Sequence, residues 1–237
     1  MKTILTTLIL FHNFLTFAQG FTFQCDSLKV DYYNSISENS ELVHSCPTIP
    51  IDTSQIPDNF LKNVQNYLIE RVGSTFYSRL SFEDARAIDT IHDDSWWTDK
   101  PWLDKRNVKK LKYSFRYSFT VQDSMKYYFS VSFDKKSRRT SPHYLPSVKQ
   151  INDFDKKIHT CNAIAIANMD KIFSGQADFI DFEYYPKTNS FMWVIEKPDI
   201  KIDEENVITR QILIDINSGN IVKRRELKGI IVKPSTL

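Results

Sequence analysis

The chain of 237 residues has few glycines and few cysteines, five and three respectively. It contains no Gly-x-Ser-x-Gly elbow, no phosphate-binding loop and no dinucleotide-binding glycine pattern. It also contains no Cys-x-x-Cys and no His-x-x-x-His pair, the spacings that most often hold zinc. We therefore expect no cofactor and no metal ion, and the sequence identifies no catalytic residue.

Long apolar runs are absent after the first twenty residues, which have the three parts of a secretory signal. Lys2 provides a positive start, an apolar stretch follows from Ile4 to Phe17, and Ala18 and Gly20 are the small residues at positions −3 and −1 of a cut before Phe21. The stretch is too short and too polar to cross about 30 Å of hydrocarbon. Residues 1–20 are thus predicted to be a cleaved signal peptide, and the mature protein to be periplasmic or secreted, with no membrane-spanning segment.

Excess charge of either sign is also missing. The chain has 31 Lys and Arg against 29 Asp and Glu, so its net charge is +2, and loss of Lys2 with the signal leaves +1. A nearly neutral chain has no overall electrostatic attraction to nucleic acid. With 14% aromatic residues, the composition is typical of a packed globule rich in sheet.

The three cysteines are Cys25, Cys46 and Cys161. In an oxidising compartment an odd number leaves one thiol free or paired between chains. A bridge between Cys25 and Cys46 would close a loop of about twenty residues and stabilise the fold by about 3 kcal/mol. We expect Cys161, which falls in a predicted helix, to be a small buried residue.

The rest of the chain divides into a lead and two halves. Residues 21–56 are polar and broken by prolines, which predicts an irregular segment. Residues 57–150 begin with a helix from Asp58 that Gly73 ends, followed by a strand over Phe76–Phe82 and a β-hairpin over Leu111–Phe133. In that hairpin, pairing of Val121 with Met125 places all the alternating apolar residues on one face.

Residues 151–232 repeat this order. A helix is predicted near Asp155–Ile172, with Ile158, Cys161, Ala165, Met169 and Ile172 on its apolar side. Four strands are predicted to follow: Phe179–Tyr185, Phe191–Glu196, Val207–Ile216 and Ile221–Leu227. Each half thus reads as a helix followed by three or four antiparallel strands, which predicts an α+β fold of two units related by duplication.

The second half resembles the PepSY-type domain, a cystatin-like unit of exported bacterial proteins, over about Asp155 to Lys228. The matching segments are a helical run at 163–167, an apolar strand at 191–195 and an Asp-x-x-Ser-Gly turn between two apolar strands at 214–222. The resemblance implies two cystatin-like units, each with a helix packed on a curved antiparallel sheet. It also implies a non-enzymatic domain that binds or restrains another exported protein.

The hairpin brings basic residues to its open end. The candidate binding patch contains Lys105, Arg106, Lys109, Lys110, Lys135, Lys136, Arg138 and Arg139, with Trp96, Trp97 and Trp102 in the preceding loop. Like charges that face each other across two strands are destabilising unless an anion, acidic residues or solvent relieves them. The patch therefore predicts an anionic ligand, lipid headgroup or acidic partner, although local acids or plain solvent would also relieve the charge.

Two other clusters of polar residues have simpler interpretations. His92, Asp93 and Asp94 are adjacent in sequence and are interpreted as a solvated turn. Asp181 and Glu183 alternate on one strand and are interpreted as its polar side. The preferred function is an exported, non-catalytic binding or inhibitory module that recognises another exported protein or an anionic surface. The alternatives are an exported hydrolase whose site is not visible in the sequence, and an immunity-type protein that neutralises a toxin.

Overall fold

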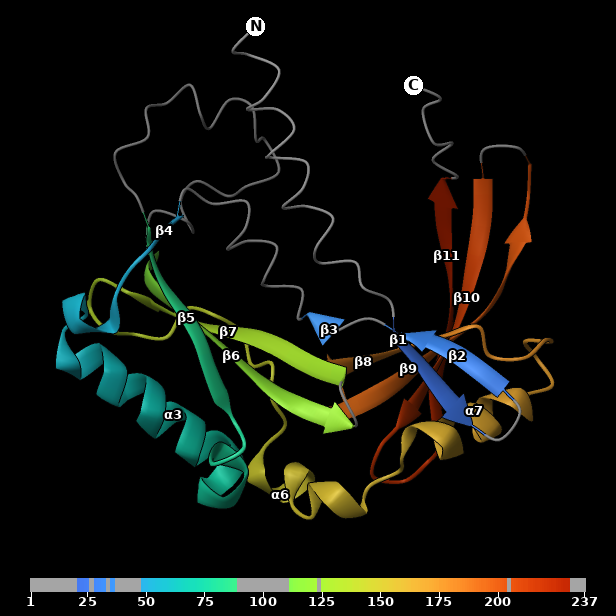
Figure 1. Ribbon diagram of the computed structural model, residues 1–237, viewed down its shortest axis with the longest axis horizontal. Coiled ribbons are helices and arrows are strands. Elements are labelled where there is room, and N and C mark those ends of the chain that lie inside the picture. The colour runs from blue at the N-terminus through green and yellow to red at the C-terminus, as the bar shows by residue number, and fades with distance from the viewer. Residues whose placement is uncertain are drawn as a thin grey trace, which may run out of the picture.

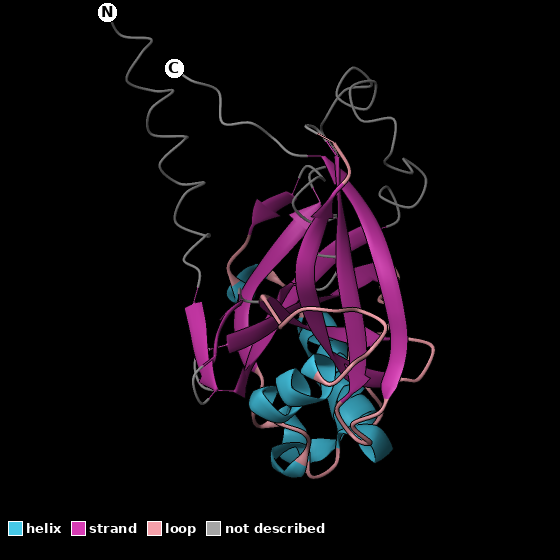
Figure 2. Ribbon diagram, turned by 90° about the vertical axis from the view of Figure 1, so that its right-hand side faces the viewer, coloured by secondary structure: helices cyan, strands magenta, loops and turns pink. Residues whose placement is uncertain are grey.

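The computed structural model describes residues 21–25, 28–32, 35–36, 48–88, 111–122, 125–203 and 206–230. The predicted signal, residues 1–20, lies outside this part. The protein is a mixed α+β fold built mostly of two sheets, whose strands run antiparallel apart from two short parallel pairs. Figure 2 shows the helices gathered on one side of the strands. The predicted α+β class is therefore confirmed.

The first sheet has five strands in the order β3-β7-β6-β5-β4. Their bounds are β3 (Ser35–Ile36), β4 (Thr48–Pro50), β5 (Ser81–Ile88), β6 (Leu111–Gln122) and β7 (Met125–Asp134). The helix α3 (Asp58–Tyr77) runs below this sheet in Figure 1. It buries one face, with residues spaced every three or four positions: Phe60, Val64, Leu68, Val72 and Phe76.

The predicted hairpin is confirmed as β6 and β7. Phe119 lies opposite Tyr127 and Tyr117 lies opposite Phe129, as expected. Near the turn the register shifts, so that Gln122 and not Val121 pairs with Met125. A bulged strand accommodates one extra residue, so this shift leaves the aromatic pairs in register.

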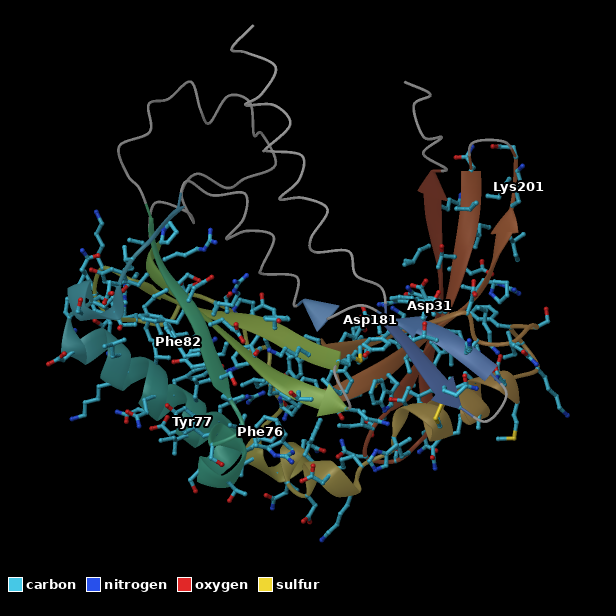
Figure 3. All side chains as sticks on the ribbon, in the orientation of Figure 1. Asp31, Phe76, Tyr77, Phe82, Asp181 and Lys201 are labelled. Carbon is cyan, nitrogen blue, oxygen red and sulfur yellow. A yellow bond between two sulfur atoms is a disulfide. The ribbon has the colours of Figure 1, made fainter. Side chains whose placement is uncertain are left out.

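The first helix continues beyond its predicted end. Gly73 has φ 78° and ψ 159° and interrupts the regular helix, but another turn follows as far as Tyr77. The predicted strand over Phe76–Phe82 is wrong, since β5 begins only at Ser81. The reason is that Phe76 reaches the core from a helical turn, where its ring lies 5.1 Å from that of Phe119. Figure 3 shows Phe76 and Tyr77 at the end of α3, with Phe82 on β5.

The second sheet has six strands in the order β1-β2-β8-β9-β10-β11. Their bounds are β1 (Phe21–Cys25), β2 (Leu28–Tyr32), β8 (Phe179–Tyr185), β9 (Ser190–Lys201), β10 (Asn206–Asp215) and β11 (Ile221–Ile230). All four strands predicted for the second half are present. The turn between β10 and β11 is closed by Asp215, whose Oδ1 accepts hydrogen bonds from the backbone of Asn217 and Ser218, and by Gly219 at φ 72°.

The second helix is shorter than predicted. Short turns precede it, α6 (Val148–Ile151) and the 3₁₀ segment η2 (Phe154–Lys156), and the helix α7 spans only Thr160–Asn168. Gln122 of the β6–β7 hairpin fixes its start, because the side-chain oxygen accepts from both the N–H and the hydroxyl of Thr160. Met169 and Ile172, predicted to face the core, are 72% and 67% exposed.

The predicted irregular lead instead contains strands. Within the described parts of residues 21–56, β1 and β2 extend the six-stranded sheet, β3 and β4 extend the five-stranded one, and a 3₁₀ turn η1 (Thr53–Gln55) precedes α3. The segment joins the sheets because β2 lies alongside β8 and β3 alongside β7, both in parallel. Its backbone groups therefore find partners at the edges of both sheets.

The disulfide differs from the predicted one. Cys25 of β1 is bonded to Cys161 of α7, with a Cα–Cα distance of 5.4 Å and a sequence separation of 136. The expected Cys25–Cys46 bridge is thus not formed, and Cys46 lies outside the described residues. Cys161, predicted to be a small buried residue, is instead a half-buried bridging residue. The bond attaches the β1–β2 hairpin to the helix that packs on β9 and β10.

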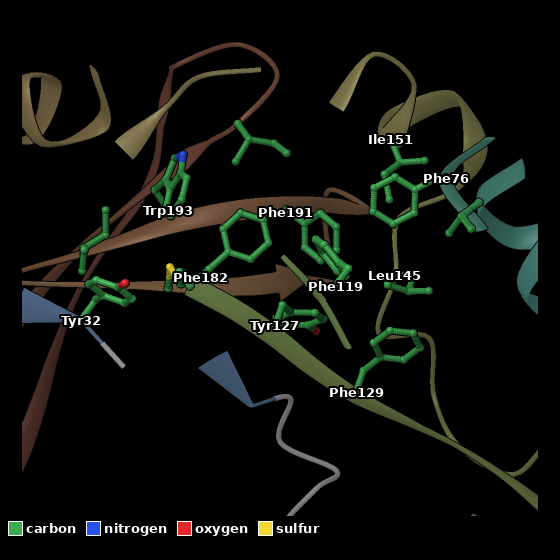
Figure 4. Packing of buried hydrophobic residues seen from close by; sticks show 14 of the residues in the cluster. Tyr32, Phe76, Phe119, Tyr127, Phe129, Leu145, Ile151, Phe182, Phe191 and Trp193 are labelled. Atoms are coloured by element: carbon green, nitrogen blue, oxygen red, sulfur yellow. The ribbon is translucent and has the colours of Figure 1, made fainter. Parts of the chain in front are cut away.

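The two sheets share one hydrophobic core, shown in Figure 4. Phe119 and Tyr127 of the first sheet meet Phe182 and Phe191 of the second, with ring centroids 5.3 to 6.4 Å apart. Trp193 closes the far end, where its indole N–H donates to the carbonyl of Ile158. This continuous aromatic layer holds the two sheets in a fixed relation.

Candidate functional site

Part of the predicted basic patch can be located in the structure. Trp96, Trp97, Trp102, Lys105, Arg106, Lys109 and Lys110 lie outside the described residues, as do His92, Asp93 and Asp94. Lys135, Lys136, Arg138 and Arg139 lie in the turn that follows β7. The structure therefore places only these four residues of the patch.

Asp134 organises this turn. Its carboxylate accepts the backbone N–H groups of Lys136 and Arg138 at 2.8 and 3.0 Å, and also pairs with the Arg138 guanidinium at 2.7 Å. These contacts, first of all the backbone hydrogen bond from Arg138, hold the pKa of Asp134 below its usual value. Arg138 is thus neutralised locally, while Lys135 and Lys136 remain exposed.

Arg139 points away from Asp134 and toward the helix α3. Its guanidinium lies 5.0 Å from the ring centroid of Tyr67, and it donates to the carbonyl of Ser141 and, at 3.4 Å, to Nε2 of His143. The rings of Tyr67 and His143 are stacked at 5.9 Å, and the tyrosine hydroxyl lies 2.9 Å from Nδ1 of the imidazole. A cation, a phenol and an imidazole thus form one compact group.

Arg71 adds a second guanidinium one helical turn after Tyr67. It donates through Nε to the carbonyl of Leu145 at 2.7 Å, and through Nη2 to the hydroxyl of Tyr184 and the side-chain oxygen of Asn189. Residues four apart share one side of a helix, so Tyr67 and Arg71 face the same loop. We call Arg71, Arg139, His143, Tyr67 and Tyr184 the cationic cluster.

The cationic cluster contains no carboxylate. Among the described residues neither Arg71 nor Arg139 forms an ion pair, and their hydrogen bonds go to neutral oxygens and an imidazole nitrogen. Burial lowers the pKa of His143, and the nearby positive charges of Arg139 and Arg71 lower it further. Burial raises the pKa of the Tyr67 hydroxyl in spite of the same two arginines. Positive charge is therefore concentrated here without compensation.

Only part of this cluster could be predicted from the sequence. Arg139 belongs to the predicted patch, but Arg71 and Tyr67 precede it by about seventy residues and flank the apolar stripe of α3. Periodicity identifies a helical stripe and its flanks, but it does not identify which loop will lie against them. Their spacing of four residues beside Leu68 and Val72 is the one signal that was available.

A small cavity lies between the two sheets in the described part of the chain. It measures about 40 Å³ and is bordered by Trp193, Phe182 and His159. Ligand pockets usually measure about 300–1,000 Å³.

The described residues contain no group of three or more His, Cys, Asp or Glu that could hold a metal ion. No described helix is long and apolar enough to cross a membrane.

Other polar groups are explained by the fold. Lys197 is 1% exposed and donates to the side-chain oxygen of Asn168 and the carbonyl of Gly175, which holds the loop between α7 and β8. Burial lowers the pKa of its amine. Glu183 pairs with Arg225 at 3.0 Å across the sheet. These groups tie strands and loops together.

The strand β11 forms one edge of the six-stranded sheet over ten residues. Its exposed side chains include Lys223, Glu226 and Lys228. Charges of this kind protect an edge strand from pairing with another chain. We therefore assign the edge no ligand and take the cationic cluster as the candidate site.

Comparison with models of known families, with curated proteins and with solved structures finds no match to this chain.

Proposed function

We propose that this protein is an exported, non-catalytic binding module that recognises an acidic segment of another exported protein through the cationic cluster. One observation carries the proposal. Arg139 and the imidazole of His143 contact Tyr67, Arg71 lies one helical turn further along α3, and no carboxylate in the described structure pairs with either arginine. Charge of one sign that is left uncompensated on a surface favours a partner of the opposite sign.

An acidic protein segment suits the cluster better than a lipid surface. The planar guanidinium matches a carboxylate in two parallel hydrogen bonds. Recognition of anionic lipid usually takes four to eight exposed basic residues next to each other. Here Arg71 and Arg139 are half-buried and engaged with a loop, and the exposed lysines nearest in sequence are Lys135 and Lys136, in the turn before Arg139. A small number of directed donors fits a small number of carboxylates.

The predicted export and the two-unit organisation belong to the same proposal. A disulfide between Cys25 and Cys161 supports an oxidising compartment. The element order α3-β5-β6-β7 followed by α7-β8-β9-β10-β11 supports two units, residues 57–150 and 151–232, each with a helix on an antiparallel sheet. Their assignment as cystatin-like, with a PepSY-type second unit, rests on the sequence resemblance.

The alternatives differ in what they need. A hydrolase needs a pocket where titratable groups converge, and a cavity of about 40 Å³ with structural hydrogen bonds around it does not favour one. An immunity-type protein would use the same kind of surface against a toxin, so it is a special case of the binding module. The identity of the bound partner distinguishes an immunity-type protein from another kind of binding module.

A pull-down tests the proposal. Residues 21–237 are immobilised and exposed to the exported fraction of the host, in parallel with R139Q/H143Q and with the control K223Q/K228Q, which alters exposed lysines of β11. We expect one stoichiometric partner with the unmodified protein and the control, and its loss with R139Q/H143Q. Retention by all three would contradict the proposed site. Binding to vesicles of anionic lipid in place of a protein would contradict the proposed partner.

A further inference from the structure

We infer that the cationic cluster is a binding site for a single oxyanion group, which binds between Arg139 and Arg71 and draws a proton onto His143. The inference rests on the proposed function for the source of the oxyanion, a carboxylate of an acidic partner. The site itself is defined by contacts within this chain, so a small oxyanion can probe it without the partner.

The hydrogen bonds define the protonation of His143 in the free protein. A guanidinium can only donate, so the contact of 3.4 Å between Arg139 Nη2 and Nε2 requires Nε2 to accept. The proton of the neutral ring is therefore on Nδ1, where it is donated to the hydroxyl of Tyr67 at 2.9 Å. His143 is exposed enough to exchange protons with water, because only part of the ring is covered.

The groups that face His143 explain why the ring is neutral. Arg139 approaches from its own loop, and Tyr67 and Arg71 approach from α3. Two of these three groups are cations and none is an acid. A positive charge on the imidazole would therefore be repelled by both arginines. The same arrangement makes the free site ready to accept negative charge.

An oxyanion reverses this balance. Arg139 Nη2 can turn its N–H from His143 to the anion, which frees Nε2 to take a proton and donate to the same anion. The negative charge also offsets the repulsion from Arg71 and Arg139. Protonated His143 is thus stabilised in the complex and disfavoured in the free protein, so that binding and protonation favour each other.

This coupling has a definite sign. The pKa of His143 lies below its usual 6.5 in the free protein and rises when the oxyanion binds. Between these two values the affinity increases as the pH falls, by up to about tenfold per pH unit for a single coupled proton. Above the higher value the affinity no longer depends on this residue.

Sulfate is the probe of choice because it remains a dianion from pH 5 to 8. Titration calorimetry of residues 21–237 with sulfate, in two buffers of different ionisation heat, measures the affinity and the protons taken up. We expect weak binding that strengthens toward pH 5, with net proton uptake. A peptide of six glutamates should show the same trend, whereas inorganic phosphate binding more tightly than the peptide would indicate a phosphate site and overturn the carboxylate assignment.

The variants separate the two parts of the inference. R139Q should weaken sulfate binding at least about tenfold at every pH, since it removes a charged donor. H143Q should retain binding but lose the pH dependence and the proton uptake, and K223Q/K228Q should behave as the unmodified protein. Absence of sulfate binding, or a pH dependence that persists in H143Q, would overturn the inference. Neither result would contradict the capture of a protein partner in the pull-down, because a protein partner can use further contacts.

Discussion

Replacing Cys25 and Cys161 by alanine opens a covalent ring whose ends are 136 residues apart. In the loop-entropy description, a crosslink of this length restricts the unfolded chain by about 5 kcal/mol at 25 °C. The whole stability of a folded protein is usually about 5–15 kcal/mol. The bond also holds the β1–β2 hairpin, which otherwise joins β8 through only two paired positions, Asp31 with Phe179 and Tyr32 with Ile180. We therefore expect a large loss of stability.

Urea unfolding followed by far-UV circular dichroism measures this loss. C25A/C161A, and the unmodified protein after reduction, should each lose about 3–5 kcal/mol of unfolding free energy. C46A is the matched control and should lose less than about 1 kcal/mol. Peptide mapping without reduction should recover Cys25 linked to Cys161. A loss of several kcal/mol in C46A, or recovery of Cys46 linked to Cys25 or Cys161 in the peptide map, would refute the pairing, because Cys46 would then be a bridging residue.

The remaining predictions concern single side chains. K197M should cost about 1–3 kcal/mol of unfolding free energy, because it leaves buried acceptors of the α7–β8 loop without their donor, and chemical denaturation measures this. D170N should destabilise the protein at pH 7, but the difference should begin to shrink below about pH 4 and vanish only below the lowered pKa of Asp170, because the stabilisation by the ion pair with Arg224 is lost as that carboxylate protonates. F119A should cost about 3–5 kcal/mol in one cooperative transition, and two separate transitions in calorimetry would contradict a shared core.

Elements governed by local patterns could be predicted from the sequence. The β6–β7 hairpin follows from strict alternation, and the pairs Phe119–Tyr127 and Tyr117–Phe129 follow from the short turn between the strands. The β10–β11 turn follows from Asp215 and Gly219, whose side-chain acceptor and positive φ close it without help from distant residues. Sequence reasoning succeeds here because the interactions that decide the structure are only a few residues apart.

Elements decided by distant contacts were mispredicted. Phe76 alternates with its neighbours as in a strand, yet the aromatic core draws it from a helical turn. The start of α7 depends on Gln122 of another hairpin, and the partner of Cys25 is set by where β1 lies against α7. None of these contacts leaves a periodic signal near the residue concerned.

The candidate site shows the same division. Arg139 was identified because it adds to a run of basic residues, but the same run suggested Arg138, which Asp134 neutralises only four positions away. Tyr67 and Arg71 join the site through the fold of the loop at 139–147 against α3. A binding site assembled from separate segments becomes visible only when the loops that connect its elements are placed.

The aromatic layer between the sheets has a consequence for the history of such a chain. If two similar units were once separate, each would have needed its own closed interior. Here Phe119 and Tyr127 of the first sheet are covered by Phe182 and Phe191 of the second. The interior of each half is therefore closed by side chains of the other half. A gene fragment ending near residue 150 would encode the first sheet alone, with the rings of Phe119 and Tyr127 exposed to water.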